Sequence, residues 1–97
     1  MSIAMSARDD LEQRLRREAR DVYGWSNGPV DTYAAHSHSY TKILYCTSGS
    51  IDFVTEADDR VIHLEAGDRM ELPAGTRHSA VIGAAGVTCI EGKKGSP

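Results

Sequence analysis

The sequence lacks the features of a membrane-inserted or nucleic-acid-binding protein. No apolar run approaches the length needed to cross a bilayer. Its 11 basic residues against 14 acidic ones give a formal net charge of −3, and no basic stripe could neutralise a series of phosphates. The arginines between Arg14 and Arg20 alternate with acidic residues, which is typical of a solvated helix face. We therefore expect neither a membrane nor a nucleic acid as partner.

Cysteine is also scarce. Cys46 and Cys89 are the only two cysteines, lie far apart and form no CxxC unit. The stretch from Met1 to Ala7 has neither the basic start nor the long apolar run of a signal peptide. We expect a cytoplasmic protein with free thiols. A GxSxG elbow, a phosphate-cradling glycine loop and a serine placed by motif beside a histidine are absent too, which disfavours a covalent hydrolase.

The residues that are present indicate one small globular domain. A chain of 97 residues, 40% hydrophobic and 26% charged, is long enough to bury one core but not two. Nine glycines against three prolines favour many tight turns, and so short strands rather than a helical bundle.

The N-terminal part has the pattern of a helix. Ser6 is a suitable N-cap, and Leu11, Leu15 and Val22 form a narrow apolar stripe, which predicts a helix over 6–21. The stripe is too thin for an independent core. We expect the helix to pack along the outside of a sheet or across a dimer interface.

The rest of the chain alternates short β-prone runs with turn signals. After a loop or irregular edge strand over 23–29, we predict strands over 32–35, 38–47, 51–55, 60–64, 69–72, 78–82 and 87–91. Short strands without intervening helices indicate an antiparallel sandwich or barrel. We therefore expect a helix and connector over 1–24, a barrel over 25–92 and a disordered tail over 93–97.

Two histidines lie close together in a strand-like stretch. His36 and His38 are separated by one residue, so both imidazoles are expected to point the same way. The alternation adds Tyr40, Lys42 and Cys46 to that face, which runs from polar to apolar as in a barrel with a site at its mouth. Tyr40 is either a hydrogen-bond donor to a ligand or a core aromatic, and Cys46 is interpreted as a small buried hydrophobe.

A second stretch ends in another histidine. Gly67 permits a tight turn into a short strand, and Pro73 and Gly75 end that strand and reverse the chain. His78 then begins the next strand. This strand–turn–strand arrangement is suited to bring a third imidazole to the first two.

Together the two stretches resemble the signature motifs of the cupin superfamily. The first motif matches at His36, His38 and Gly49, and the second at Gly67, Pro73, Gly75 and His78. The resemblance spans about Trp25 to Glu91 and implies an all-β, small antiparallel jelly-roll barrel, with the short N-terminal helix outside it. It also implies that His36, His38 and His78 hold a divalent metal ion, for which Zn, Fe, Ni, Mn and Cu are candidates.

The sequence departs from the motifs at three positions. Val30 stands where the first glycine belongs and Ile82 where the second motif has asparagine. Lys42 replaces the metal-binding glutamate. Three interpretations of Lys42 stay open: it extends out of the barrel mouth, it binds the carboxylate or phosphate of a ligand, or it serves as a general base. We favour the second. The substitution is also compatible with a metal-free barrel that holds an organic anion.

Other residues are assigned by alternation. Glu71 is expected to face outward because Met70 and Leu72 fill the core, and His63 is expected to be structural or exposed. Trp25 and Tyr33 are candidates to close the barrel mouth. Ile43 and Tyr45 would lie on the outer face, exposed to water in a monomer, which favours a homodimer that covers them.

Two functions follow from this pattern. One is a metalloenzyme acting on a small, anionic metabolite, with the metal on the three histidines and with Lys42 and Tyr40 as the candidate catalytic residues that address the ligand. The other is a non-catalytic ligand-binding or sensor barrel, with or without metal.

Overall fold

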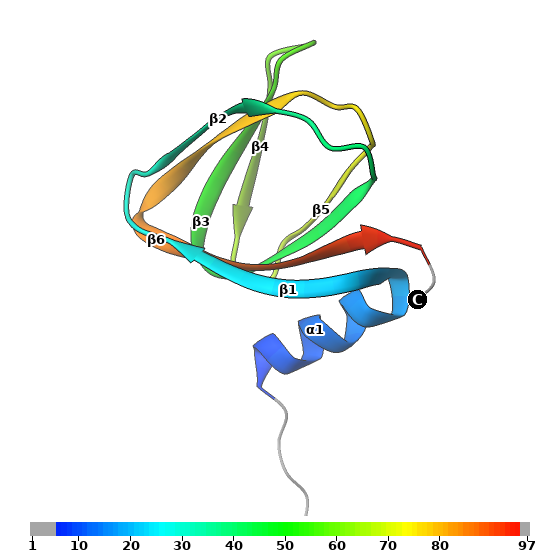
Figure 1. Cartoon of the computed structure of the whole chain (residues 1–97). Coiled ribbons are helices and arrows are strands. Elements are labelled where there is room, and N and C mark those ends of the chain that lie inside the picture. The colour runs from blue at the N-terminus through cyan, green and yellow to red at the C-terminus, as the bar shows by residue number, and fades with distance from the viewer. Residues whose placement is uncertain (1–5, 96–97) are drawn as a thin grey trace, which may run out of the picture.

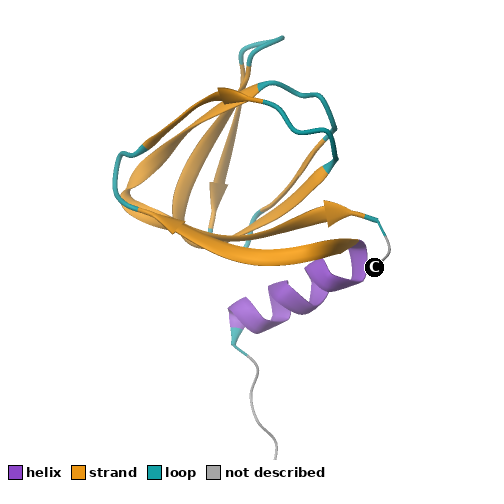
Figure 2. Cartoon of the chain, viewed as in Figure 1, coloured by secondary structure: helices purple, strands orange, loops and turns teal. Residues whose placement is uncertain are grey.

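The computed structural model describes residues 6–95, which fold into one helix and six strands that close into an open-ended barrel (Figures 1 and 2). Its elements in chain order are α1 (Ala7–Glu18), β1 (Ala19–Asn27), β2 (Thr32–His36), β3 (Lys42–Thr55), β4 (Arg60–Glu65), β5 (Arg69–Leu72) and β6 (His78–Lys94). Within residues 6–95, no helix is long and apolar enough to cross a membrane. The predicted all-β barrel with a short N-terminal helix is confirmed.

Two long strands hold the sheet together. The strand order is β1-β6-β3-β4, while β2 pairs with β6 and β5 pairs with β3, and every pairing is antiparallel. Strand β6 uses its first part for β2 and its last part for β1. Strand β3 likewise pairs first with β5 and then with β4. These divided pairings curl the sheet around one interior.

The long strands bend where the sequence predicted turns. Ser48 and Gly49 lie inside β3 at two register shifts against β6, and the expected turn over 83–86 lies inside β6. Gly49 has φ +72, and a Cβ atom there would lie 2.0 Å from the Gly86 carbonyl oxygen. Only glycine permits both the positive φ and that approach of two backbones. The bulges let residues on both sides of the bend face the barrel interior.

The apolar side chains form two separate cores. The barrel interior is filled by Leu44, Cys46, Ile51, Phe53, Leu64, Met70, Leu72, Ala80, Ile82, Val87 and Cys89. The second core lies between α1 and the outer face of the sheet and contains Leu11, Leu15, Ala19, Ile43, Tyr45 and Ile90.

Helix α1 covers the outer face of the sheet, where we expected Ile43 and Tyr45 to be exposed to solvent in a monomer. Ile43 is 0% exposed and Tyr45 is 5% exposed, because α1 packs Leu11 and Leu15 against them (Figure 1). The Tyr45 hydroxyl also donates a hydrogen bond to Glu18 Oε2 at 2.8 Å. The argument for a homodimer from exposed Ile43 and Tyr45 is therefore wrong, since the chain supplies its own cover. A homodimer stays a prediction without that support.

The ends of the barrel also differ from expectation. Helix α1 ends at Glu18, and β1 replaces most of the expected connector, with a bulge near Asp21, which has φ 54. Strand β6 continues through Lys94, so Lys93 pairs with Arg20 instead of beginning a disordered tail. Most residues of β1 and the last residues of β6 are polar and exposed or half-buried, so the sequence shows no clear apolar alternation there. Ser96 and Pro97 lie outside the described residues.

Candidate metal centre

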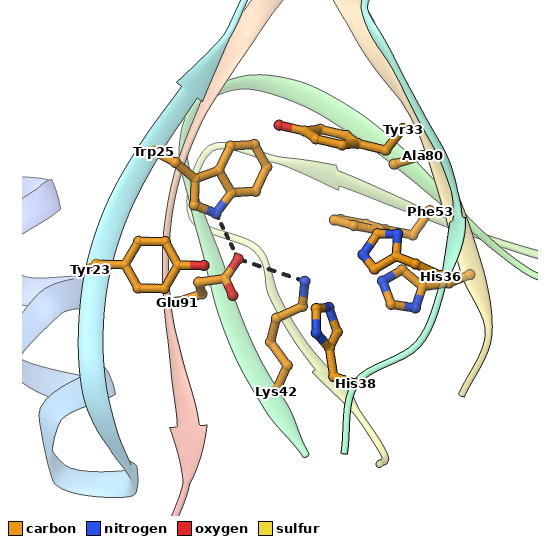
Figure 3. Close-up of a pocket in the computed structure, with 10 residues that line it drawn as sticks. Tyr23, Trp25, Tyr33, His36, His38, Lys42, Phe53, Ala80 and Glu91 are labelled. Carbon is orange, nitrogen blue, oxygen red and sulfur yellow. Dashed lines mark hydrogen bonds and ion pairs between the residues drawn. The ribbon is translucent and has the colours of Figure 1, made fainter. Parts of the chain in front are cut away.

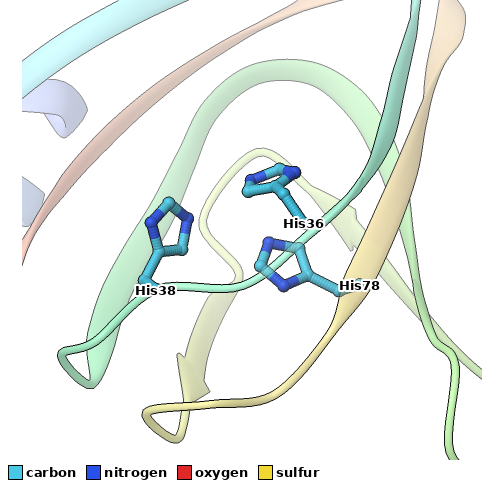
Figure 4. A group of neighbouring side chains, drawn as sticks. All are labelled: His36, His38 and His78. Carbon is cyan, nitrogen blue, oxygen red and sulfur yellow. The ribbon is translucent and has the colours of Figure 1, made fainter.

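Pairing between β2 and β6 brings two of the predicted histidines together. His36 lies directly opposite His78, next to a bulge in β2 that turns the end of the strand. Their ring centroids are 4.5 Å apart. The ring of His38 lies 4.9 Å from that of His36 and 5.5 Å from that of His78 (Figure 4). The structure therefore gathers all three histidines that the sequence motifs indicated.

His38 reaches the cluster from a loop, not from a strand. The expected strand over 38–47 begins only at Lys42, and residues 37–41 form an irregular connection. The turn after β5 holds this connection: the Gly75 amide donates to the His38 carbonyl at 2.8 Å, and the Ala74 amide donates to Thr41 Oγ1 at 3.2 Å. Gly75 has φ +79, which the turn requires. The second motif therefore fixes the position of a residue from the first.

The hydrogen bonds of two of the rings leave one nitrogen of each ring free to bind a metal. Nδ1 of His36 lies 2.9 Å from the Ala34 carbonyl oxygen, and Nδ1 of His78 lies 2.9 Å from that of Thr76. A carbonyl oxygen only accepts, so both Nδ1 atoms donate and both Nε2 atoms carry a lone pair. One ligand atom from each of the three rings lies within 4.8 Å of the others.

The donor set fits a divalent metal. Nε2 of His38 and Nε2 of His78 are buried and have no hydrogen-bond partner among the described residues. Buried polar atoms without a partner are costly, and a metal ion would satisfy them. Backbone carbonyls that accept from the second ring nitrogen are the usual support for metal-binding histidines.

The surroundings keep two imidazoles neutral, as metal binding requires. Burial lowers the pKa of His38 below its ordinary value, and the nearby Lys42 ammonium lowers it further. Burial likewise lowers the pKa of His78, with a smaller contribution from Lys42 and against the opposing effect of the Thr76 carbonyl. Both shifts favour the unprotonated form of these rings.

The histidines form one side of a cavity of about 270 Å³ (Figure 3). Its lining consists of Tyr23, Trp25, Tyr33, His36, His38, Lys42, Phe53, His78, Ala80 and Glu91. Trp25 and Tyr33, expected near the barrel mouth, meet edge to face with centroids 6.0 Å apart. Half of the lining residues are aromatic or aliphatic, and the other half are the three histidines, Lys42 and Glu91.

Lys42 lies inside the barrel as half of a buried ion pair. Its ammonium is 3.6 Å from Glu91 Oε1, and the two side chains are 6% and 5% exposed. The same carboxylate oxygen accepts a hydrogen bond from Trp25 Nε1 at 2.7 Å (Figure 3). Burial raises the pKa of the neighbouring Tyr23 to about 12, and Glu91 contributes to that shift. Lys42 thus does not extend out of the barrel mouth.

Glu91 is the site residue that the sequence interpretation missed. It ends a predicted strand and shares its face with Val87 and Cys89, both of which are buried in the barrel. Strict alternation therefore predicts that Glu91 also points inward. A buried carboxylate of this kind requires a cation, and the inward-facing Lys42 is the complementary residue.

The remaining candidates lie outside the cavity. Tyr40 packs its ring 5.0 Å from that of His38 and beneath the Lys93 ammonium, and it is not among the cavity-lining residues. His63 is exposed and interacts with Asp52, as expected for a structural histidine. Glu71 faces outward and pairs with Arg69 and Lys94, which confirms its predicted orientation.

Both cysteines lie in the barrel core. Cys46 and Cys89 are each 0% exposed and have free thiols, as expected. The two residues lie opposite each other in the pairing of β3 with β6. Burial raises the pKa of both thiols, which disfavours the thiolate and agrees with the role of small apolar residues.

Comparison with known structures supports the same architecture. An RmlC-like cupin from Shewanella frigidimarina NCIMB 400 matches 75% of this chain and 63% of its own, with 20% identity and a TM-score of 0.65. The DMSP lyase DddQ from Ruegeria pomeroyi DSS-3 matches 76% of this chain but 37% of its own, with 20% identity and a TM-score of 0.69. A cupin-2 domain containing protein, also from Shewanella frigidimarina NCIMB 400, matches 95% of both chains, with 15% identity and a TM-score of 0.64.

These identities establish the fold alone, and the chain spans less than two thirds of the first two proteins. No curated protein matches it. The model of the cupin domain family, however, matches residues 27–90, which include all three clustered histidines. The chain therefore belongs to the cupin domain family.

Proposed function

We propose that this cupin binds a divalent metal on His36, His38 and His78 and uses it to bind a small anionic metabolite in the adjoining cavity. The observation that carries the proposal is the pair of buried, unpartnered Nε2 atoms, which converge with the third histidine. A divalent ion held there would act as a Lewis acid toward an oxygen atom of the ligand.

The charges around the site favour an anion as the ligand. Three neutral imidazoles leave the two positive charges of the ion uncompensated, because the glutamate of the cupin motif is replaced by Lys42. Glu91 does not restore the balance, since its charge is matched by that of Lys42. The apolar wall strengthens attraction between the ion and a negative group, because the effective dielectric constant is lower there than in water.

The protein residues have separate roles in this proposal. The Ala34 and Thr76 carbonyls hold two of the imidazoles in the tautomer that binds metal. Lys42 faces the cavity and is the candidate ligand contact, while Glu91 and Trp25 hold its surroundings in place. Tyr40 supports the His38 ring from behind, so any action on the ligand would pass through that histidine.

Metal titration tests the proposal. Protein freed of metal with a chelator is dialysed against Zn²⁺, and the bound zinc is measured by elemental analysis. We expect about one zinc per chain in the wild type and a loss of zinc in His36→Gln and His78→Gln. The control is His63→Gln, which alters an exposed histidine outside the cluster and should retain the metal.

Two results would contradict the proposal. One is the absence of zinc uptake by the wild-type protein. The other is an equal loss of zinc in the His63→Gln control, which would show that the metal is bound by surface imidazoles.

Acetate binding, measured by calorimetry, then tests the ligand class: we expect it in the zinc-loaded protein and not in the metal-free protein.

A further inference from the structure

The ammonium of Lys42 has unused hydrogen-bonding capacity inside the cavity. Lys42 is only 5% exposed, yet among residues 6–95 its ammonium interacts with Glu91 at 3.6 Å and with the Phe53 ring at 5.7 Å and donates no hydrogen bond. An ammonium has three N–H donors, and that of Lys42 lies at the cavity wall and is not among the fully enclosed atoms without a partner. A ligand atom in the cavity can therefore accept a hydrogen bond from Lys42.

Glu91 offers the complementary acceptor. Its carboxylate accepts from Trp25 Nε1 at 2.7 Å and from the Tyr23 hydroxyl, but a carboxylate has about four lone-pair positions, so acceptor capacity remains. The 3.6 Å separation from Lys42 is longer than a direct hydrogen bond. Figure 3 shows the charged ends of both side chains facing each other at the cavity, joined by the dashed line of their ion pair.

The chemistry of this gap selects the group that fits it. A second carboxylate would be repelled by Glu91, and an amine would be repelled by Lys42. A hydroxyl group suits both, because it accepts from the ammonium and donates to the carboxylate. A hydroxyl oxygen placed beside the line between the two charged atoms can lie about 2.8 Å from each of them.

We infer that the ligand is a small hydroxycarboxylate whose hydroxyl group lies between Lys42 and Glu91 while its carboxylate lies at the three histidines. The carboxylate half of this inference rests on the proposed metal site. The cavity of about 270 Å³ is near the lower end of the range for ligand pockets, so the molecule is small. Phe53 and Ala80 provide apolar contacts for its carbon chain.

Butyrate and its 2-, 3- and 4-hydroxy derivatives provide the test. These four probes share one carboxylate and differ in where the hydroxyl group lies. Their affinities for the zinc-loaded protein are measured by calorimetry, with the zinc content determined in parallel. We expect the 3- or the 4-hydroxy compound to bind about tenfold more tightly than butyrate, as a hydrogen bond to charged groups typically provides.

The variant Lys42→Met/Glu91→Gln removes both charges together and leaves no unpaired ion. In it, the affinity ratio between the better hydroxybutyrate and butyrate should fall to about one. The 2-hydroxy compound is the internal control, because its hydroxyl group adjoins the carboxylate and can chelate the metal without Lys42. Any advantage of the 2-hydroxy compound should persist in the double variant.

The outcomes separate this inference from the proposed function. Failure to take up zinc would contradict the metal site itself. Zinc uptake with equal affinity for butyrate and for the 3- and 4-hydroxy compounds would overturn the inference alone. Zinc uptake with no binding of any of them would overturn the inference and also contradict the anionic ligand of the proposed function. A hydroxyl advantage of the 3- or 4-hydroxy compound that survives in the double variant would also overturn it.

Discussion

Lys42 and Glu91 form an ion pair across two adjacent strands, with 3.6 Å between Nζ and Oε1 and with both side chains buried. In the sheet, Glu91 lies opposite Leu44, so it is the diagonal neighbour of Lys42 on the inner face. Lys42 occupies the place of the usual cupin glutamate, and β6 returns a carboxylate to the same cavity. Because the charges of Lys42 and Glu91 cancel, the pair adds no net charge to the metal-free barrel.

Removing one member of this pair should destabilise the protein more than removing both. Lys42→Met leaves the Glu91 carboxylate buried without its cation, and we expect a loss of about 3 to 5 kcal/mol in the free energy of unfolding. In Lys42→Met/Glu91→Gln most of this loss should be recovered, since the amide oxygen still accepts from Trp25. Urea denaturation of the metal-free proteins measures both values.

The single variant Glu91→Gln completes the thermodynamic cycle. Additive effects of the two substitutions would show that Lys42 and Glu91 do not interact, which contradicts the buried ion pair.

Restoring the glutamate of the motif should lower the stability of the metal-free protein and raise its affinity for zinc. Lys42→Glu places a carboxylate beside Glu91, so we expect a lower melting temperature for the metal-free protein at neutral pH. A fourth ligand at that position should tighten zinc binding at least tenfold, because it supplies negative charge to the ion. Zinc titration with a competing chelator measures the affinity, and Lys42→Gln controls for loss of the lysine. Weaker zinc binding in Lys42→Glu than in Lys42→Gln would contradict this account.

The histidines of the metal-free protein should titrate in two groups. Burial lowers the pKa of His38 and of His78 below the ordinary value of 6.5. A hydrogen bond to Asp52, together with Glu65, raises the pKa of the exposed His63 above 6.5. Ring-proton chemical shifts followed against pH by NMR measure each midpoint. A midpoint of His78 above that of His63 would contradict the burial of the His78 imidazole.

These shifts have opposite effects on stability. The unfolded chain takes up protons at His38 and His78 at a higher pH than the folded chain does, so their contribution makes folding less favourable as pH falls below 6.5. The contribution of His63 is present below 6.5 and is lost as pH rises through its raised pKa. In His63→Gln the loss of stability on acidification should therefore be steeper.

The helix α1 should contribute to stability through the second core. Leu15 is 0% exposed between α1 and the sheet, so Leu15→Ala should cost about 2 to 5 kcal/mol of the free energy of unfolding. Arg14→Ala changes the adjacent exposed position and should cost less than about 0.5 kcal/mol. Equal effects of the two substitutions in urea denaturation would show that α1 does not cover Ile43 and Tyr45.

The sequence was sufficient for the barrel and for the three histidines, because both depend on local signals. Turn residues such as Gly67 and Gly75 set strand ends, and the His-x-His pair and His78 carry strong motif positions. Gly49 was misinterpreted: a glycine at a bulge and a glycine in a turn have the same local signature. As a result, β3 was predicted as two strands, and the turn expected over 83–86 divided β6 in the same way.

The rest depended on which surfaces meet in space. Strand β1 was anticipated only in part, as one of two alternatives over 23–29, and its first residues were assigned to the helix, because charged and polar residues such as Arg20 and Ser26 are exposed along it. The burial of Ile43 depends on which surface α1 packs against, and the apolar periodicity of the helix does not determine that surface. The Lys42–Glu91 pair joins residues far apart in the chain, although the alternation around each one would have placed both inside.

The most direct test of the central claim is a crystal structure of the zinc-loaded protein with diffraction recorded at the zinc absorption edge. We predict one strong anomalous peak per chain, about 2.0 to 2.1 Å from a ring nitrogen of each of His36, His38 and His78. No peak among these three rings, or the strongest peak at His63, would contradict the claim that this barrel is built to hold a metal.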